Sequence, residues 1–129
     1  MAAAASTVAI VKCGSQDRGP WDAASDQIGN KALRWAIVAV TQDTGTYTTG
    51  GQAVDILGTL DDYGWTAIYL GQSLPFTTNS VLSEFRVMDP NNATPGSRKV
   101  TCHLTTTGAE LAGSQAHTAG TWYMFVQGI

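Results

Sequence analysis

The chain is short, weakly charged and mildly acidic. Its 129 residues can form one domain with a buried core, and no linker or internal repeat divides them. Only 13% of the residues are charged, against about 25% in typical soluble domains, and the formal net charge is −3. Scattered basic residues in an acidic chain exclude binding to the phosphate backbone of nucleic acids, which requires clustered Lys and Arg.

The first 31 residues are predicted to form an N-terminal arm and a long loop within the same domain as the rest. Ser6 to Lys12 has the composition of a strand and follows four alanines, Ala2 to Ala5. Gly14 to Lys31 lacks periodicity and contains Trp21, which is either an exposed anchor for a partner or a lid on the core. We expect no signal peptide and no membrane span, because the start lacks a basic region and no apolar run approaches about 18 residues.

Ala32 to Thr41 has the clearest strand pattern in the chain. After the first positions, apolar residues occupy both faces of this segment, with Leu33, Trp35, Ile37 and Ala39 on one and Ala36, Val38 and Val40 on the other. Such a pattern predicts a central strand that is covered on both sides.

A glycine corner follows this strand, in the stretch Thr-Tyr-Thr-Thr-Gly-Gly from Thr46 to Gly51. Gly50 and Gly51 predict a backbone with positive φ at this corner. The apolar residues just beyond are expected to pack under the sheet, with Asp55 pointing outward or capping: Ala53, Val54, Ile56 and Leu57. Gln52 to Leu60 allows at most one or two helical turns.

Short strands separated by turn signals fill the remainder of the chain. The expected strands are Thr66 to Leu70, Val81 to Met88, Lys99 to Thr106 and Thr121 to Gln127. Asp89 to Ser97 is a turn-rich connection, and the loop Gly108 to Gly120 contains Leu111 as a buried tether. The pattern predicts an all-β domain over residues 32–129, a single antiparallel sandwich or barrel of jelly-roll-like form with six to eight short strands.

The sequence offers little catalytic chemistry. Asp43-Thr44-Gly45 matches the catalytic tripeptide of retroviral-type aspartic proteases, which would act as a dimer, but a turn aspartate is the favoured interpretation. His103 and His117 lack ligands at zinc spacing, and Asp61, Asp62 and Glu110 lie in no calcium-binding loop. We therefore predict no enzyme activity, no cofactor and no metal site.

Cysteines and aromatic residues permit two further expectations. Cys13 and Cys102 have 88 residues between them (102 − 13 − 1) and are expected to be reduced, buried apolar residues rather than a disulfide. Four aromatic residues would form a sugar-stacking platform if they were exposed on one face: Trp21, Tyr63, Trp65 and Tyr69. Core positions are the favoured alternative.

Residues 32–129 resemble small virion structural proteins of tailed bacteriophages. The resemblance rests on the apolar strand at 35–41, the glycine corner that follows this strand, the strand Glu84 to Met88 and the aromatic strand Thr121 to Val126. Such proteins commonly have a Tyr-x-Thr-Gly-Gly corner followed by a short apolar segment. The matching residues here are Tyr47, Thr49, Gly50 and Gly51.

The resemblance implies a non-enzymatic β-sandwich that resides in the virion after assembly in the host cytoplasm. A capsid decoration (cement) protein is the first expectation, and a tail or fibre component or a carbohydrate-binding module is the alternative. The expected partners are the major capsid protein or another virion protein and further copies of the chain, with a trimer favoured. The segments expected to contact a partner contain Ala2, Ala3, Ala4, Ala5, Arg18, Pro20 and Trp21.

Overall fold

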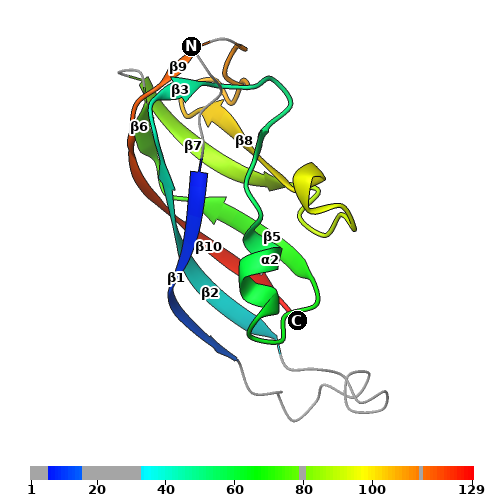
Figure 1. The fold of residues 1–129 in the computed structure, drawn as a ribbon. Coiled ribbons are helices and arrows are strands. Elements are labelled where there is room, and N and C mark those ends of the chain that lie inside the picture. The colour runs from blue at the N-terminus through cyan, green and yellow to red at the C-terminus, as the bar shows by residue number, and fades with distance from the viewer. Residues whose placement is uncertain (1–5, 16–32, 79–80, 114) are drawn as a thin grey trace.

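The computed structural model describes residues 6–15, 33–78, 81–113 and 115–129, and these form an all-β fold (Figure 1). The strands are β1 (Ser6–Ser15), β2 (Arg34–Gln42), β3 (Gly45–Thr46), β4 (Gln52–Ala53), β5 (Ile68–Ser73), β6 (Phe76–Thr78), β7 (Val81–Met88), β8 (Lys99–Leu104), β9 (Ala116–His117) and β10 (Gly120–Gly128). Helix α2 spans Ile56–Asp61, and Pro95–Ser97 forms one 3-10 turn. The predicted fold class is confirmed. The ten strands exceed six to eight because β3, β4 and β9 have two residues each.

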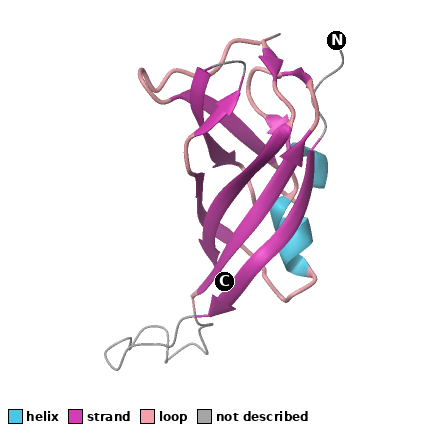
Figure 2. Cartoon of the chain, turned by 90° about the vertical axis from the view of Figure 1, so that its left-hand side faces the viewer, coloured by secondary structure: helices cyan, strands magenta, loops and turns pink. Residues whose placement is uncertain are grey.

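Eight strands form one antiparallel sheet that curls into a half-barrel (Figures 1 and 2). Their order is β1-β2-β10-β5-β7-β8-β4, and β6 pairs with β7. Strand β2 pairs with β1 on one side and with β10 on the other, so its predicted central position is confirmed. The last strand, β10, therefore lies inside the sheet, between β2 and β5.

The inner face of the curled sheet holds the core. Alternate residues of the strands point inward, and the fully buried ones are Ala36, Val38, Val40, Phe85, Val100, Cys102, Met124 and Val126. The rings of Phe85 and Trp122 stack among them, with centroids 4.0 Å apart and planes 4° from parallel. Burial of each large apolar side chain stabilises the fold by about 1.5 to 3 kcal/mol.

The corner and α2 close the open side of the half-barrel. Gly50 and Gly51 have φ of 89° and 110°, as predicted. Asp55 caps the helix, since its Oδ1 accepts from the Gly58 backbone N–H at 2.8 Å and from the Arg98 side chain at 2.9 Å. Three apolar side chains of the helix point into the core: Ile56, Leu57 and Leu60. Val54 is buried as predicted, whereas Ala53 is exposed because it lies on the edge strand β4.

Two expectations about strands need correction. The strand expected at Thr66 begins at Ile68, because the backbone N–H groups of Thr66 and Ala67 both donate to the carbonyl oxygen of Ile129. The expected cover on both sides of β2 is also wrong for a single chain. Its inward residues are buried, but no second layer of the described residues lies over the outward residues Trp35 and Ile37, which stay half-buried.

Candidate docking surface

The outward side chains of four adjacent strands form an apolar surface. In the register of β2 and β10, Ile37 lies opposite Phe125 and Ala39 lies opposite Tyr123. On the other side of β10, Gln72 of β5 pairs with Phe125. Residues on either side of these positions in β10 point into the core, so Tyr123 and Phe125 must point outward.

We define the outer apolar face by six side chains: Trp35, Ile37, Leu70, Leu74, Tyr123 and Phe125. The exposed fractions of the last four are 52%, 75%, 51% and 44%, although all are large and apolar or aromatic. Single exposed apolar residues are common on soluble domains, but a contiguous group on one sheet face marks an interaction site. The antiparallel sheet of an isolated domain would be expected to place polar residues there.

Aromatic packing fixes one end of the outer apolar face. The rings of Trp35 and Phe125 are stacked across β2 and β10, with centroids 6.5 Å apart and an interplanar angle of 14°. Gly14 of β1 lies opposite Trp35, and a Cβ atom at Gly14 would lie 2.9 Å from the indole. Because Gly14 has no side chain, the indole of Trp35 can lie over β1 at this position.

A shallow hollow of about 380 Å³ lies in the outer apolar face. Its lining is Ile37, Gln72, Ser73, Leu74, Tyr123, Met124 and Phe125. A small-molecule site usually combines apolar walls with several convergent polar groups. Here the polar groups of the lining are those of Gln72, Ser73 and Tyr123, and the hollow is open to solvent. It therefore suits an apolar side chain of a protein partner better than it suits a small molecule.

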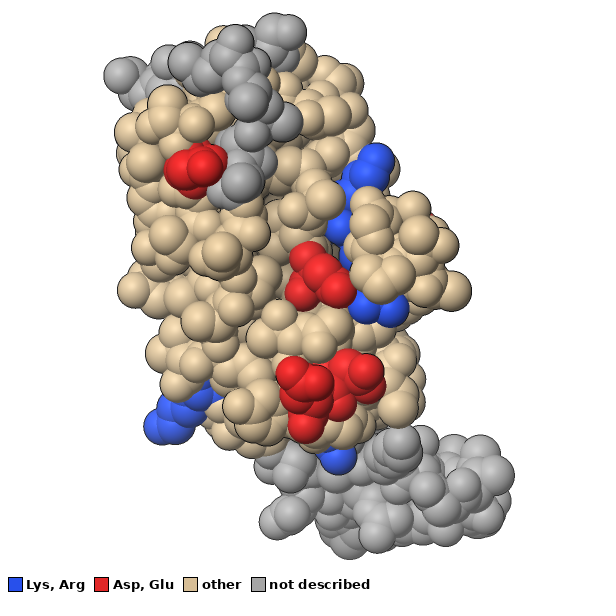
Figure 3. All heavy atoms as spheres, in the orientation of Figure 1, with Lys and Arg blue, Asp and Glu red and all other residues tan. Residues whose placement is uncertain are grey.

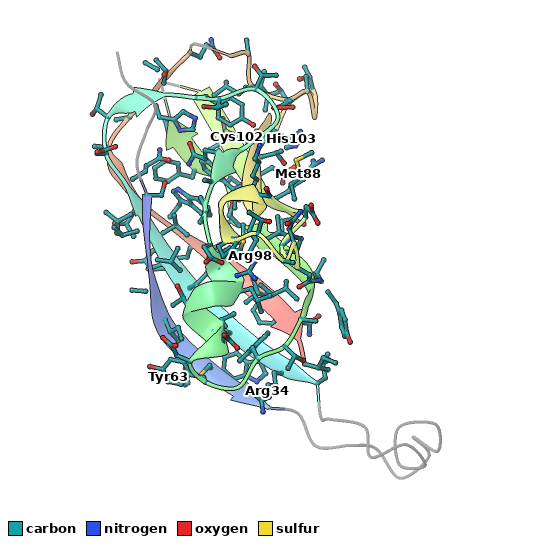
Figure 4. All side chains as sticks on the ribbon, turned by 45° about the vertical axis from the view of Figure 1, so that its right-hand side comes forward. Arg34, Tyr63, Met88, Arg98, Cys102 and His103 are labelled. Atoms are coloured by element: carbon teal, nitrogen blue, oxygen red, sulfur yellow. The ribbon has the colours of Figure 1, made fainter. Side chains whose placement is uncertain are left out.

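Charge separates the outer apolar face from the neighbouring strands. Lys12 is the one charged side chain at the outward positions described for β1, β2, β10 and β5. On β7, Glu84 and Arg86 form an ion pair, and the hydrogen bond from Arg86 lowers the pKa of Glu84. The charged half of the sheet continues on β8, where Lys99 pairs with Met88 of β7. Figure 4 labels Met88 on β7. On the side that carries α2, acidic side chains lie around the helix (Figure 3).

Comparisons with protein family models, curated proteins and solved structures found no match to this chain. No helix within the described residues is long and apolar enough to cross a membrane.

The predicted corner residue Tyr47 is the centre of a buried hydrogen-bond network. Its hydroxyl donates to Glu110 Oε2 at 2.8 Å and accepts from the Cys102 backbone N–H at 3.1 Å. The same carboxylate oxygen accepts from the Gly50 backbone N–H at 2.7 Å. Burial, together with the bond to Glu110, raises the pKa of Tyr47. These groups hold the corner against β8 and leave Glu110 in a structural role.

His117 is fully buried and takes part in a second polar network. Gln42 Nε2 lies 3.1 Å from His117 Nδ1, and Gln52 Nε2 donates to Gln42 Oε1 at 3.2 Å. Burial lowers the pKa of His117, which is therefore neutral at pH 7. His117 Nε2 and Trp122 Nε1 are buried without a hydrogen-bond partner among the described residues.

The catalytic and metal candidates that the structure describes lie on separate elements of the fold. Asp43 is exposed on the turn between β2 and β3, as the turn interpretation predicted. His103 is the strand partner of Glu84 and forms an isolated backbone β-bridge with Glu110, and its spacing from these two residues in the sequence did not predict either pairing. Its ring nitrogens lie 3.1 Å from Gly108 O and 3.0 Å from Thr101 Oγ1. No group of three metal-ligating side chains occurs among the described residues.

The cysteine and aromatic expectations are partly corrected. Both cysteines are free, but Cys13 is exposed because β1 is an edge strand, so its predicted burial is wrong. Cys102 is buried as expected, and burial raises the pKa of its thiol to about 11. Trp65 is 2% exposed in the core, as the favoured interpretation predicted, whereas Tyr63 and Tyr69 are exposed and their predicted core positions are wrong. Trp21 lies outside the described residues, and the other three residues do not form a platform.

The predicted partner-contacting residues lie outside the described residues: Ala2, Ala3, Ala4, Ala5, Arg18, Pro20 and Trp21. The outer apolar face was not predicted as a site. The sequence does contain a pattern that indicates this face, because Ala32 to Thr41 and Thr121 to Gln127 are apolar at both odd and even positions. Apolar residues on both faces indicate a covered strand but do not say which molecule covers it.

Proposed function

We propose that this chain is a non-enzymatic structural protein of a tailed-bacteriophage virion and that it decorates the capsid. The observation that carries the proposal is the outer apolar face, with Leu74, Tyr123 and Phe125 exposed on an almost uncharged sheet. A subunit of an assembly requires such a surface, whereas it lowers the solubility of an isolated domain. The place in a virion comes from the resemblance of the corner and strands to phage structural proteins.

The internal polar groups support a structural rather than a catalytic role. Tyr47 and Glu110 are engaged in holding the corner, and His117 is buried behind Gln42. The Cys102 thiol, with a pKa of about 11, is not a nucleophile at neutral pH. A rigid domain whose reactive groups are engaged in the fold is suited to mechanical reinforcement.

Reinforcement of a capsid would come from interface area at the junctions between capsid subunits. A specific interface must bury about 1,000 Å² or more, and linked copies convert weak individual contacts into avid attachment. The predicted contacts of the chain with the major capsid protein lie in residues 2–5 and around Trp21.

Cosedimentation with phage heads that lack the protein tests the proposal. The full chain should bind at a fixed ratio to capsid subunits and should raise the temperature at which the heads break. Binding without stabilisation, or no binding at all, would remove the decoration assignment. Binding to tails or to polysaccharide instead would support the fibre or carbohydrate alternative.

The predicted contact at Trp21 is tested in the same assay by Trp21→Ala. A substitution is preferable to deletion of residues 1–31, because β1 belongs to the sheet and its Val8 and Ile10 pack against the core. Loss of a buried aromatic anchor typically weakens binding by about 2 kcal/mol or more, which is roughly 30-fold. Unchanged binding would show that Trp21 is not an anchor.

A further inference from the structure

We propose that the outer apolar face packs against the same face of a second copy, so that two sheets form one β-sandwich. The inference names the partner of the surface on which the proposed function rests. Its starting point is the pattern of β2 and β10, which are apolar on both faces although the described residues of one chain cover only one of these faces. Apolar residues on both faces are typical of strands that lie between two layers.

The charge distribution favours a second copy as the occupant. A two-fold interface brings each patch against itself, so any concentrated charge would meet its like. Only Lys12 contributes a charge at the described outward positions of these four strands, and it lies on the edge strand β1. The ion pair of Glu84 and Arg86 lies on β7 at the border of the proposed contact, where Glu84 accepts from Gln72 at 3.1 Å, and its two charges cancel. Two copies can therefore approach without burying like charges.

The size of the face is sufficient for a stable pair. Strands β2 and β10 have nine residues each, so they are about 30 Å long at roughly 3.3 Å per residue. Counting the outward positions of β1 beside the outer apolar face, four strands spaced by about 4.8 Å, of which β5 has only six residues, give roughly 540 Å² per copy. The pair would bury about 1,100 Å², which reaches the approximate lower limit of 1,000 Å² for a specific interface.

The relief of the face supports interlocking contact. The hollow of about 380 Å³ lies beside Leu74, whose side chain is 75% exposed. A projecting apolar side chain next to an apolar hollow is what a self-complementary interface requires, because each copy supplies both parts. Aligned sheets of a sandwich interdigitate their side chains in this way at a spacing of about 10 Å.

Face-to-face stacking uses the surface once per copy and therefore closes as a dimer. The proposal replaces the trimer that the resemblance implies, because the described residues offer no second apolar sheet face on which a third copy could stack. A dimer also has two sets of the predicted capsid contacts, which would increase its avidity for a capsid.

Sedimentation equilibrium of the full chain over a range of concentrations tests the inference. The wild type should be a dimer that dissociates on dilution. Leu74→Glu and Tyr123→Glu place a charge inside the interface twice, once from each copy, and should weaken dimerisation by about 100-fold or more. Both positions are more than half exposed in the single chain, so each variant should keep the fold and serve as a check on the other.

Leu82→Glu is the matched control, because Leu82 is 49% exposed on β7, in the charged half of the sheet. It should dimerise like the wild type. A wild type that is monomeric or trimeric, or a control as weak as the two test variants, would overturn the inference. Capsid binding separates the two proposals: a monomer that decorates heads refutes the dimer alone, and a dimer that ignores heads refutes the virion function alone.

Discussion

The hydroxyl of Tyr47 joins three segments that are far apart in the sequence. It connects the corner to the Cys102 backbone of β8 and to Glu110, which also binds the Gly50 backbone. We expect Tyr47→Phe to destabilise the fold by about 1 to 3 kcal/mol, because the buried N–H of Cys102 loses its acceptor. Urea unfolding measures the change.

Tyr63→Phe is the matched control for this prediction. Tyr63 is 62% exposed near the end of α2, where its backbone oxygen accepts from Arg34 at 2.9 Å (Figure 4). Removal of its hydroxyl should change the free energy of unfolding by less than about 0.5 kcal/mol. Equal effects of the two substitutions would contradict the role assigned to the Tyr47 network.

His117 makes the stability of the fold dependent on pH. Its pKa is lowered from 6.5 by burial, so the unfolded chain takes up a proton at a higher pH than the folded chain does. The contribution of His117 to the stability should therefore be constant above about pH 6.5, and the stability should fall as the pH decreases from 6.5 toward the lowered pKa. Unfolding midpoints between pH 7.5 and pH 5 measure this loss.

Substitution of one histidine at a time shows which imidazole causes the pH dependence of the stability. His117→Gln should reduce the slope of stability against pH in that range, at some cost in stability. His103→Gln, at the other histidine of the sequence, is the comparison variant, because its partly exposed ring lies outside the buried network. A slope that survives in His117→Gln would refute the assignment.

At the scale of elements, the cap of α2 connects the helix to the loop before β8. Asp55 accepts from the Gly58 N–H and from Arg98, whose Nε also donates to the carbonyl oxygen of Asn92 at 2.7 Å. Asp55→Ala should cost about 1 to 2 kcal/mol, because both the cap and the partner of Arg98 are lost. Asp55→Asn keeps a capping oxygen and should cost less.

Thermal unfolding of the two variants tests this element. Asp61→Ala at the exposed last residue of α2 is the control and should have little effect. If Asp55→Asn were as destabilising as Asp55→Ala, the cap would contribute nothing and the ion pair with Arg98 would account for the whole loss.

Local patterns predicted the elements well and their arrangement poorly. The span of β7 and the burial of its Ser83 and Phe85 followed from strict alternation, and the glycine corner followed from the φ that Gly50 and Gly51 adopt. The insertion of β10 between β2 and β5 depends on pairing between distant residues, which no local pattern specifies. The contact of Tyr47 with Glu110 was missed for the same reason.

At the scale of the whole molecule, the outer apolar face is where the burial predicted from the sequence differs from the exposure in the structure. Phe125 and Ile37 have the residue types of a covered strand and yet point away from the core. Periodicity reports that a face is apolar but not whether the same chain or another molecule covers it. Nothing in the part of the chain that the structure describes covers the second face of β2, so we expect a partner to cover it.

Hydroxyl-radical footprinting of the chain bound to phage heads tests the central claim most directly. Tyr123 and Phe125 are half-exposed in the single chain and should be oxidised several-fold more slowly on the particle than in dilute solution. Tyr63, which is exposed beside α2, should be oxidised at similar rates in both states and serves as the internal control. Equal oxidation of Tyr123 and Phe125 in the two states would show that the outer apolar face stays open in the assembly and would contradict the account.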